Sequence, residues 1–270
     1  MRHARTVLAL AVLTAVAFTT GCGGKPDKPA DVVPSGRMIN VAAGTATPYG
    51  VGAGRVWSLT PRHKEISSVV VYLHGWGANL PFEWHQAWFE HLLARGSAVV
   101  FPAYQDGKDD SFVVAPYDMH DGLVLGFRAL GRPDVPVVAA GFSVGATLAL
   151  IYAAHALEWG VPSPRAVESI FPVDPYAIEP VLDLSSLRGI PIVLRAGDHD
   201  DVVGRDGADA LASMLNRKER ALLDYRIVRS KGSVWADHEL LPTSVLNADV
   251  RKLFWAPLDA MVADARRDPG

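Results

Sequence analysis

The chain has 270 residues, 49% of them hydrophobic and 20% charged, which is enough to bury a sizeable core. It carries 26 Lys and Arg residues against 29 Asp and Glu residues, and this formal net charge of −3 argues against nucleic acid as a partner. Its single cysteine, Cys22, excludes an intramolecular disulfide.

Residues 1–21 have the pattern of an export signal. A short basic start precedes an almost unbroken apolar run over residues 7–18, which is too short to act as a mature transmembrane helix. Small residues then lead to Cys22. The segment resembles a bacterial lipoprotein signal, in which the cysteine is lipidated and becomes the new N-terminus, although Thr19 stands where such signals usually have leucine. The alternative is an ordinary secretory signal, with Cys22 incidental.

Residues 22–35 are rich in Gly, Pro and Lys, as is typical of a solvated tether. With lipid on Cys22, we expect the protein to be exported and anchored to the outer face of the bacterial cell membrane. Otherwise we expect it to be secreted. Residues 36–270 contain no internal repeat, no second linker and no other membrane-spanning run, so we expect them to form a single domain.

Alternation of apolar, β-rich runs with helical patterns predicts a mostly parallel sheet with helices on both faces. The predicted strands span residues 38–43, 55–60, 68–73, 98–102, 135–140, 167–173, 190–196 and 222–229, and we expect the first two to form an antiparallel pair. The predicted helices span residues 83–95, 117–130, 144–159, 207–218 and 243–264, the last interrupted near Pro257. This is an α/β fold, a three-layer α/β/α sandwich around a twisted sheet of about eight strands. Little chain separates the 144–159 helix from the next strands, so we expect no large lid domain and an open site.

The most informative motif is Gly141-Phe142-Ser143-Val144-Gly145, between a predicted strand and a predicted helix. A serine hydroxyl is a poor nucleophile, and a strand–Gly-x-Ser-x-Gly–helix turn exposes and aims it. Gly141 and Gly145 remove the Cβ atoms that would clash where strand and helix approach each other. The motif predicts a nucleophile at Ser143; the alternative is a serine in an ordinary tight turn.

Two further polar residues follow later strands. Asp200 comes after the 190–196 strand and His238 after the 222–229 strand, so both share with Ser143 the carboxyl edge of a parallel sheet, where such sheets place their ligands. From about residue 36 to 265 the chain resembles the α/β-hydrolases, whose order is Ser, then Asp or Glu, then His. The resemblance implies that His238 is the general base and that an acid orients it.

The acid is the least defined member of this set. The sequence Gly197-Asp198-His199-Asp200-Asp201-Val202-Val203 offers three carboxylates, and the family pattern Gly-x-x-Asp-x-x-Val selects Asp200. Asp198 remains an alternative, and so does Asp174, because some relatives carry the acid after the preceding strand. A metal site in this Asp and His cluster is a further alternative. No second set of ligands with recognisable spacing accompanies it, so we expect no metal and no cofactor.

The turn His74-Gly75-Trp76-Gly77 directly follows the third predicted strand. The resemblance implies that the Trp76 N–H and the Val144 N–H form an oxyanion hole, each donor worth roughly 3–4 kcal/mol in the transition state. Gly75 and Gly77 let the loop fold back without Cβ clashes, and His74 is expected to brace it. The alternative is that this turn is a Gly-rich loop after a strand, with no catalytic role.

Three aromatic residues, Trp76, Tyr104 and Trp235, lie on loops at the same end of the predicted sheet, and we expect them to contact substrate. Together these residues predict an exported serine hydrolase that cleaves carboxylic esters, small or polymeric, through an acyl-enzyme. A peptidase, thioesterase or amidase that uses the same triad is one alternative. A catalytically silent surface-binding lipoprotein is another.

Overall fold

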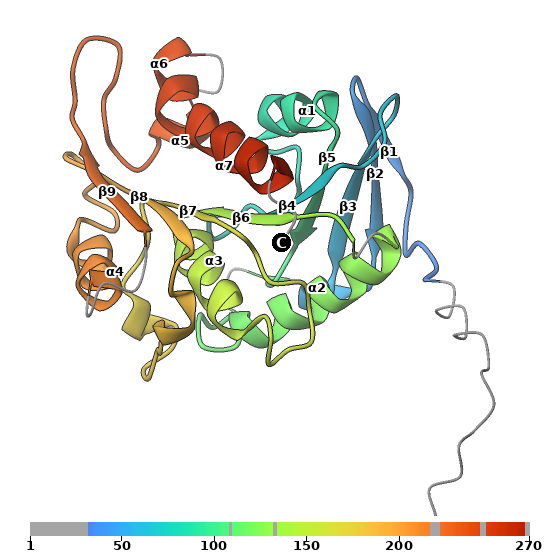
Figure 1. Ribbon diagram of the computed structural model, residues 1–270, viewed down its shortest axis with the longest axis horizontal. Coiled ribbons are helices and arrows are strands. Elements are labelled where there is room, and N and C mark those ends of the chain that lie inside the picture. The colour runs from blue at the N-terminus through green and yellow to red at the C-terminus, as the bar shows by residue number, and fades with distance from the viewer. Residues whose placement is uncertain (1–31, 108–109, 132–133, 217–221, 244–246, 268–270) are drawn as a thin grey trace, which may run out of the picture. The chain divides into compact units, whose positions relative to one another are not determined.

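The apolar runs of the sequence form a nine-stranded sheet that lies between two layers of helices (Figure 1). The structure is a computed structural model that describes residues 32–107, 110–131, 134–216, 222–243 and 247–267. The predicted signal peptide, Cys22 and the tether up to residue 31 lie outside the described residues. From Val32 onward the chain packs as one unit.

The nine strands are β1 (Ile39–Val41), β2 (Gly44–Tyr49), β3 (Val56–Pro61), β4 (Ser68–Leu73), β5 (Ser97–Pro102), β6 (Val137–Phe142), β7 (Val167–Ile170), β8 (Pro191–Gly197) and β9 (Leu222–Val228). They lie in the order β1-β2-β3-β5-β4-β6-β7-β8-β9. The pairs from β1 to β3 and the β3–β5 pair are antiparallel, and all remaining pairs are parallel. Strands β4 to β9 therefore all end at one edge of the sheet.

Helices cover both faces of this sheet (Figure 1). Helices α1 (Gln86–Ala94) and α7 (Ala256–Arg267) pack on one face, and α2 (Ala115–Leu130), α3 (Val144–His155) and α4 (Asp206–Asn216) pack on the other. The short elements are α5 (Leu240–Thr243), α6 (Ala248–Val250), a π-helical turn (Arg251–Trp255) and 3-10 turns at Gly52–Gly54, Pro175–Ala177 and Ser185–Leu187. The predicted α/β/α sandwich is confirmed.

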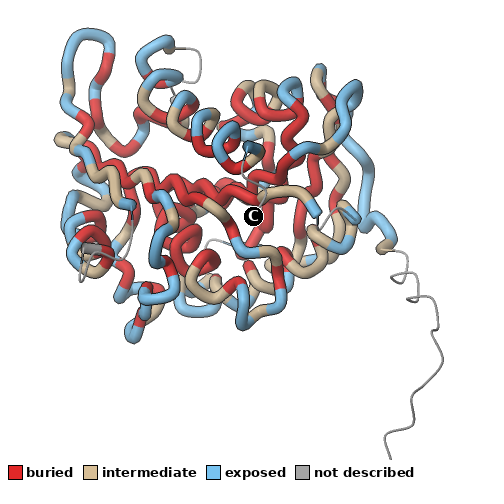
Figure 2. The backbone as a smooth tube through the Cα atoms, viewed as in Figure 1, coloured by how far each residue is buried: buried red, intermediate tan, exposed pale blue. Residues whose placement is uncertain are grey.

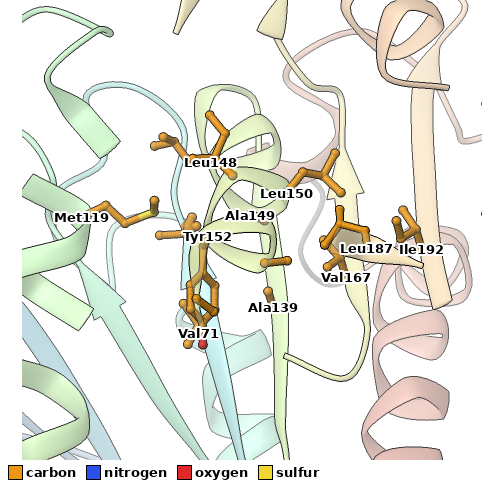
Figure 3. Close-up of a cluster of buried hydrophobic side chains, with 14 of the residues drawn as sticks. Val71, Met119, Ala139, Leu148, Ala149, Leu150, Tyr152, Val167, Leu187 and Ile192 are labelled. Carbon is orange, nitrogen blue, oxygen red and sulfur yellow. The ribbon is translucent and has the colours of Figure 1, made fainter. Parts of the chain in front are cut away.

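The core is continuous through the middle of the sheet. Every residue of β4, β5 and β6 is buried, as expected for parallel strands with both faces covered (Figure 2). Helix α3 is apolar on all sides because it is itself surrounded: Leu148 and Tyr152 share one cluster with Val71 of β4, Met119 of α2 and Leu187 (Figure 3). This packing fixes the start of α3, where the motif serine lies.

Six predicted strands, from residues 68–73 onward, are present with bounds that differ by three residues or fewer. Strand β7 ends earlier than predicted because Phe171 has a positive φ of 54°. Helix α1 begins at Gln86 rather than residue 83, and α3 ends at His155 rather than near Trp159. Continuous apolar runs thus predicted the positions of the buried strands well. The ends of the helices were predicted less accurately.

The predicted direct pairing of residues 38–43 with 55–60 is wrong. Strand β2 lies between β1 and β3 and pairs with both, so the sheet has nine strands in place of about eight. The β2 sequence contains few large apolar residues and includes Pro48, which argues against a strand. Pro48 is tolerated because β1 covers only residues 44–46 of β2, so no ladder bond is lost on that side.

The predicted C-terminal helix over residues 243–264 is divided into several pieces. The π-helical turn Arg251–Trp255 leads directly into α7, and Pro257 is the second residue of α7. A proline inside a helical run cannot donate its backbone N–H and its ring crowds the preceding turn, and the wider π-helical turn accommodates the ring. Near Pro257 the helix is therefore distorted into a π-helical turn, but it is not broken. None of the described helices is both long and apolar enough to cross a membrane.

Candidate active site

The chain turns sharply at Ser143, between β6 and α3. Ser143 has φ 58° and ψ −123°, a conformation that costs a non-glycine residue about 1–3 kcal/mol. Its N–H donates to Ile170 O at 2.9 Å, which ties the turn to the end of β7. The Gly145 N–H donates to His74 O at 3.1 Å, which ties it to the loop after β4. Two neighbouring strands therefore hold the strained serine.

The glycines around Ser143 are required by space. A Cβ on Gly141 would lie 2.1 Å from Gly145 O, and a Cβ on Gly145 would lie 2.1 Å from Leu73 O. A Cβ on Gly75 would lie 2.9 Å from the Phe142 ring and 3.5 Å from the Ser143 Cβ. Strand β6, helix α3 and the loop His74-Gly75-Trp76-Gly77, which we call the oxyanion loop, thus meet at Ser143 at distances that a side chain on these glycines would prevent.

Ser143, His238 and Asp200 form one hydrogen-bonded chain. His238 lies on the loop after β9, and its Nε2 is 2.9 Å from Ser143 Oγ. Its Nδ1 is 2.8 Å from Asp200 Oδ2, and Asp200 lies on the loop after β8. All three residues are buried, at 6%, 8% and 6% exposure for Ser143, His238 and Asp200. This is the arrangement of a nucleophile, a base and an orienting acid.

The surroundings of Asp200 keep its carboxylate ionised. Burial by itself would raise the pKa of Asp200, but hydrogen bonds from His238 and from the backbone of Val203 and Val202 outweigh burial and lower the pKa. The two backbone N–H groups donate to Asp200 Oδ1 at 3.0 Å each. An ionised Oδ2 favours the His238 tautomer with its proton on Nδ1, which leaves Nε2 free to accept the Ser143 proton.

The two alternative acids lie elsewhere. Asp174 accepts the Tyr176 N–H at 3.0 Å and caps the 3-10 turn after β7. Asp198 points to a different loop, and hydrogen bonds from His199, and then from Ser230, lower the pKa of Asp198 to about 2. Neither carboxylate bonds to His238, so Asp200 is the acid that the structure brings to the imidazole.

The backbone N–H groups of Trp76 and Val144 are candidates to hold an oxyanion. Val144 is the first residue of α3, where the helix dipole favours negative charge. Within the described residues, neither N–H has a backbone acceptor. Gly77, next to Trp76, has a φ of +94° and open space around it, so glycine serves the backbone conformation there.

His74 supports the loop after β4 through buried contacts. Its ring is fully buried and stacks on Tyr104, with centroids 4.1 Å apart and planes 9° from parallel. Its two ring nitrogens lie 2.7 Å from Gly75 O and 2.7 Å from Ala103 O. Burial lowers the pKa of His74 to about 4, against the two carbonyl contacts that raise it, so the neutral ring donates to one carbonyl. His74 therefore lies where a brace is expected.

Gln105 is a second residue that supports this loop, and no sequence pattern singled it out. It is 2% exposed, and its Oε1 accepts the Gly77 N–H at 2.7 Å, while its Nε2 donates to Gly107 O at 3.1 Å. Gln105 follows β5, and β5 pairs in parallel with β4, which carries the oxyanion loop. The loops after β4 and β5 are therefore neighbours, and this adjacency was the signal that could have pointed to Gln105.

A network of hydrogen bonds joins the acid loop to the histidine loop. Asp198 accepts the Ser230 N–H at 3.0 Å and the Ser230 hydroxyl at 2.7 Å. Ser230 Oγ in turn accepts the Ala236 N–H at 2.9 Å, and the His199 N–H donates to Ala236 O at 3.1 Å. A Cβ on Gly197 would lie 2.2 Å from Ala236 O. We call Asp198, Ser230 and Ala236 the loop clamp.

The three candidate substrate contacts have different surroundings. Tyr104 is 1% exposed and its hydroxyl donates to His74 O, so its expected substrate contact is corrected to a bracing role. Trp76 is half-buried and packs edge-on against Phe112, with centroids 4.6 Å apart. Trp235 is 57% exposed and its ring lies 4.1 Å from that of His199. Trp76 and Trp235 remain candidates.

The Asp and His cluster after β8 does not form a recognisable metal site. His199 Nδ1 lies 2.9 Å from Asp198 Oδ1 and 3.0 Å from Ser230 Oγ, so these groups are engaged with one another. Within the described ranges, no group of three or more His, Cys, Asp or Glu side chains is placed to hold a metal ion.

Solved structures resemble this chain in fold. An esterase from Pyrobaculum calidifontis matches 79% of this chain and 83% of its own, with 17% identity and a TM-score of 0.59. An esterase from Rhizomucor miehei matches 90% of this chain and 84% of its own, with 18% identity and a TM-score of 0.58. A thermostable esterase from Pseudomonas putida matches 84% and 79%, with 18% identity and a TM-score of 0.57.

No protein-family model matches the sequence, and no curated protein resembles it at a significant level. The similarity to the three esterases therefore concerns the arrangement of helices and strands. It shows that the chain has their fold, the α/β-hydrolase fold.

Proposed function

We propose that this protein is a serine hydrolase that cleaves carboxylic esters through an acyl-enzyme. The observation that carries the proposal is the hydrogen-bonded chain from Ser143 through His238 to Asp200, built on a strained strand–helix turn. That several proteins of the same fold are esterases agrees with this substrate class. The fold alone would not carry the proposal, because one fold serves many chemistries.

Each step follows from the geometry. His238 Nε2 takes the proton of Ser143 Oγ as the oxygen attacks the ester carbonyl, and ionised Asp200 stabilises the imidazolium that forms. The N–H groups of Trp76 and Val144 would hold the negative oxygen, each contributing roughly 3–4 kcal/mol. His238 then protonates the leaving alkoxide. Water repeats the sequence to release the acid and restore Ser143.

Ser143→Ala tests this proposal. We expect kcat for p-nitrophenyl acetate to fall by roughly 10⁴-fold or more, because the nucleophile is gone. Ser186→Ala is a matched control, since Ser186 is exposed and its hydroxyl bonds to Ala154 O, outside the proposed triad. Full activity in the Ser143 variant would refute the proposal. A fluorophosphonate probe gives a second measurement, because it should label the wild type and not Ser143→Ala; no labelling would favour a silent binding protein.

The same triad could serve amides or thioesters. Competing rates on an ester, a thioester and an amide with the same acyl group measure the preference directly. We expect the ester to be cleaved fastest. Faster cleavage of the amide or thioester would leave the triad assignment intact and move the protein to the peptidase, amidase or thioesterase class.

We also propose that the protein is exported and anchored by lipid on Cys22. The basic start, the apolar run and the cysteine that follows it support this. An enzyme held outside the cell would act on extracellular esters, small or polymeric. In a bacterial host, Cys22→Ser should move the protein from the membrane fraction to the medium or periplasm. An unchanged membrane fraction would contradict lipid anchoring.

A further inference from the structure

A cavity of about 590 Å³ lies apart from the triad. Its walls are the end of β9, the loop over residues 229–234 that follows, and the segment over residues 249–257 before and at the start of α7. These segments lie at the β9 end of the sheet, on the α7 face (Figure 1). None of Ser143, Asp200 and His238 lines this cavity.

A buried guanidinium lines part of the cavity. The Arg195 side chain is 5% exposed, and its Nη2 donates to Asp224 Oδ2 at 2.9 Å. Its Nη1 donates to Asp224 O at 2.7 Å and to Leu194 O at 3.0 Å. These bonds hold the guanidinium in one orientation. Binding of a ligand to Arg195 would therefore cost little conformational entropy of this side chain.

Four more cations line the same cavity: Arg226, Arg229, Lys231 and Lys252. Arg226 shares Asp224 with Arg195, through a contact of 2.7 Å. Among the described residues, the other three form no ion pair with a carboxylate. The cavity wall itself carries one described carboxylate, Asp249, which accepts the Ser233 hydroxyl at 2.7 Å. Because the whole chain has a net charge of −3, this excess of positive charge is local.

The chemistry of the wall defines the ligand. Arginine binds phosphate and carboxylate groups through paired N–H donors, and lysine adds point charges. Three cations that pair with no carboxylate in the described part of the chain favour a ligand with more than one negative charge. Val234, Leu253 and Pro257 add apolar surface, and the volume lies in the range of sites for small molecules, about 300–1,000 Å³. We propose that this cavity binds a small organic anion that carries two or more phosphate or carboxylate charges.

Binding of two probes, pyrophosphate and citrate, tests the proposal by isothermal titration calorimetry on the purified protein. We expect saturable binding of one or both probes with one site per chain, weakening as salt is raised. Lys231→Ala combined with Lys252→Ala should weaken binding by about tenfold or more, because each lysine supplies a charge-assisted contact. Arg188→Ala is the control, since Arg188 is an exposed cation outside the cavity.

Each outcome decides something. Binding of pyrophosphate alone assigns the site to phosphate groups, and binding of citrate alone assigns it to carboxylates. Absence of saturable binding for both, or equal binding by the lysine variant and the wild type, overturns the proposal. Ester hydrolysis by the lysine variant should equal that of the wild type, which shows that the variant is folded. The binding measurement itself does not depend on turnover.

Discussion

At the scale of single residues, Gly145 shows how tightly the turn at Ser143, between β6 and α3, is packed. A Cβ there would lie 2.1 Å from Leu73 O and 2.3 Å from His74 O, both backbone atoms that cannot rotate away. Gly145→Ala should therefore force β4 and α3 apart. We expect the free energy of unfolding to fall by about 3 kcal/mol and hydrolysis to be lost. Urea unfolding and active-site titration measure the two effects.

A control for this substitution lies on the surface. Gly107 has no heavy atom within 4 Å of an added Cβ and no positive φ, so Gly107→Ala should leave stability and activity unchanged. If Gly145→Ala behaved like this control, the close approach of strand, loop and helix described above would be wrong.

Glu168 is a buried carboxyl group outside the site. It lies on β7 with no exposure, and neither carboxyl oxygen has a hydrogen-bond partner within the described part of the chain. Burial raises its pKa well above the ordinary value, and attraction to Arg195 offsets only part of this. Keeping the carboxyl uncharged removes most of the cost of burying it.

Glu168→Gln should change how stability depends on pH. Because the folded-state pKa of Glu168 is raised, its contribution is fully present below the unfolded-state pKa and is lost as the pH rises above it. The glutamine variant cannot ionise, so we expect its stability relative to wild type to increase between pH 4 and pH 8. Urea unfolding at both pH values measures this. The exposed Glu83→Gln should show no such gain, and an equal gain there would contradict the explanation.

At the scale of elements, the loops after neighbouring strands hold one another in place. Gln105, after β5, accepts the Gly77 N–H of the loop after β4. Gln105→Ala should let the oxyanion loop move without touching the nucleophile. We expect kcat to fall about tenfold and KM to change little, because the oxyanion forms only in the transition state.

An inhibitor that mimics the tetrahedral state separates this effect from general loosening. A boronic acid should lose affinity for the Gln105 variant in proportion to the loss of kcat. Gln86→Ala is the control, because Gln86 lies exposed on α1 and bonds to Glu90. Unchanged boronic acid affinity would show that Gln105 does not position the oxyanion loop.

A similar prediction follows from the loop clamp and concerns the position of His238. Asp198 holds the segment that carries His238 through Ser230 and Ala236. Asp198→Ala should lower kcat by about tenfold, because His238 loses its fixed distance from Ser143, while Asp198→Asn should retain part of the rate. Steady-state kinetics with the neighbouring Asp201→Ala as control test this. Equal effects at both positions would mean that the clamp has no special role.

The elements also show what the sequence could predict. Strands β4 and β6 are buried on both faces, so their apolar runs were unambiguous. Strand β2 pairs through its backbone and has little apolar pattern, so it was missed. A similar distinction holds in the site: Ser143, Asp200 and His238 belong to a motif or a residue order that the resemblance supplied, whereas the contacts of Gln105 and Ser230 depend on which strands are neighbours.

At the scale of the whole molecule, the parallel order of β4 to β9 brings every site loop to one edge. That order could be predicted only from the resemblance, because parallel neighbours are distant in sequence. Trp76 and Tyr104 show the limit: both follow strands at the same edge, yet Tyr104 is buried beneath the loop and Trp76 is partly open. Side-chain depth depends on packing that a linear pattern does not contain.

The unit that begins at Val32 should work without the residues before it. A protein that starts at Val32 should hydrolyse p-nitrophenyl acetate with kcat within about twofold of the full chain, because the strands, helices and triad described above all lie within this unit. Kinetics and thermal unfolding of both forms check this. A large loss of either would assign residues before Val32 a part in the folded unit.

The bond between Ser143 and His238 joins positions 95 residues apart, and His238 follows β9, an edge strand that pairs with β8 and with no other described strand. During synthesis the turn at Ser143 therefore emerges well before His238 does. Under the proposed mechanism, we expect ester hydrolysis to begin only after β9 and the loop that follows it have docked on the sheet.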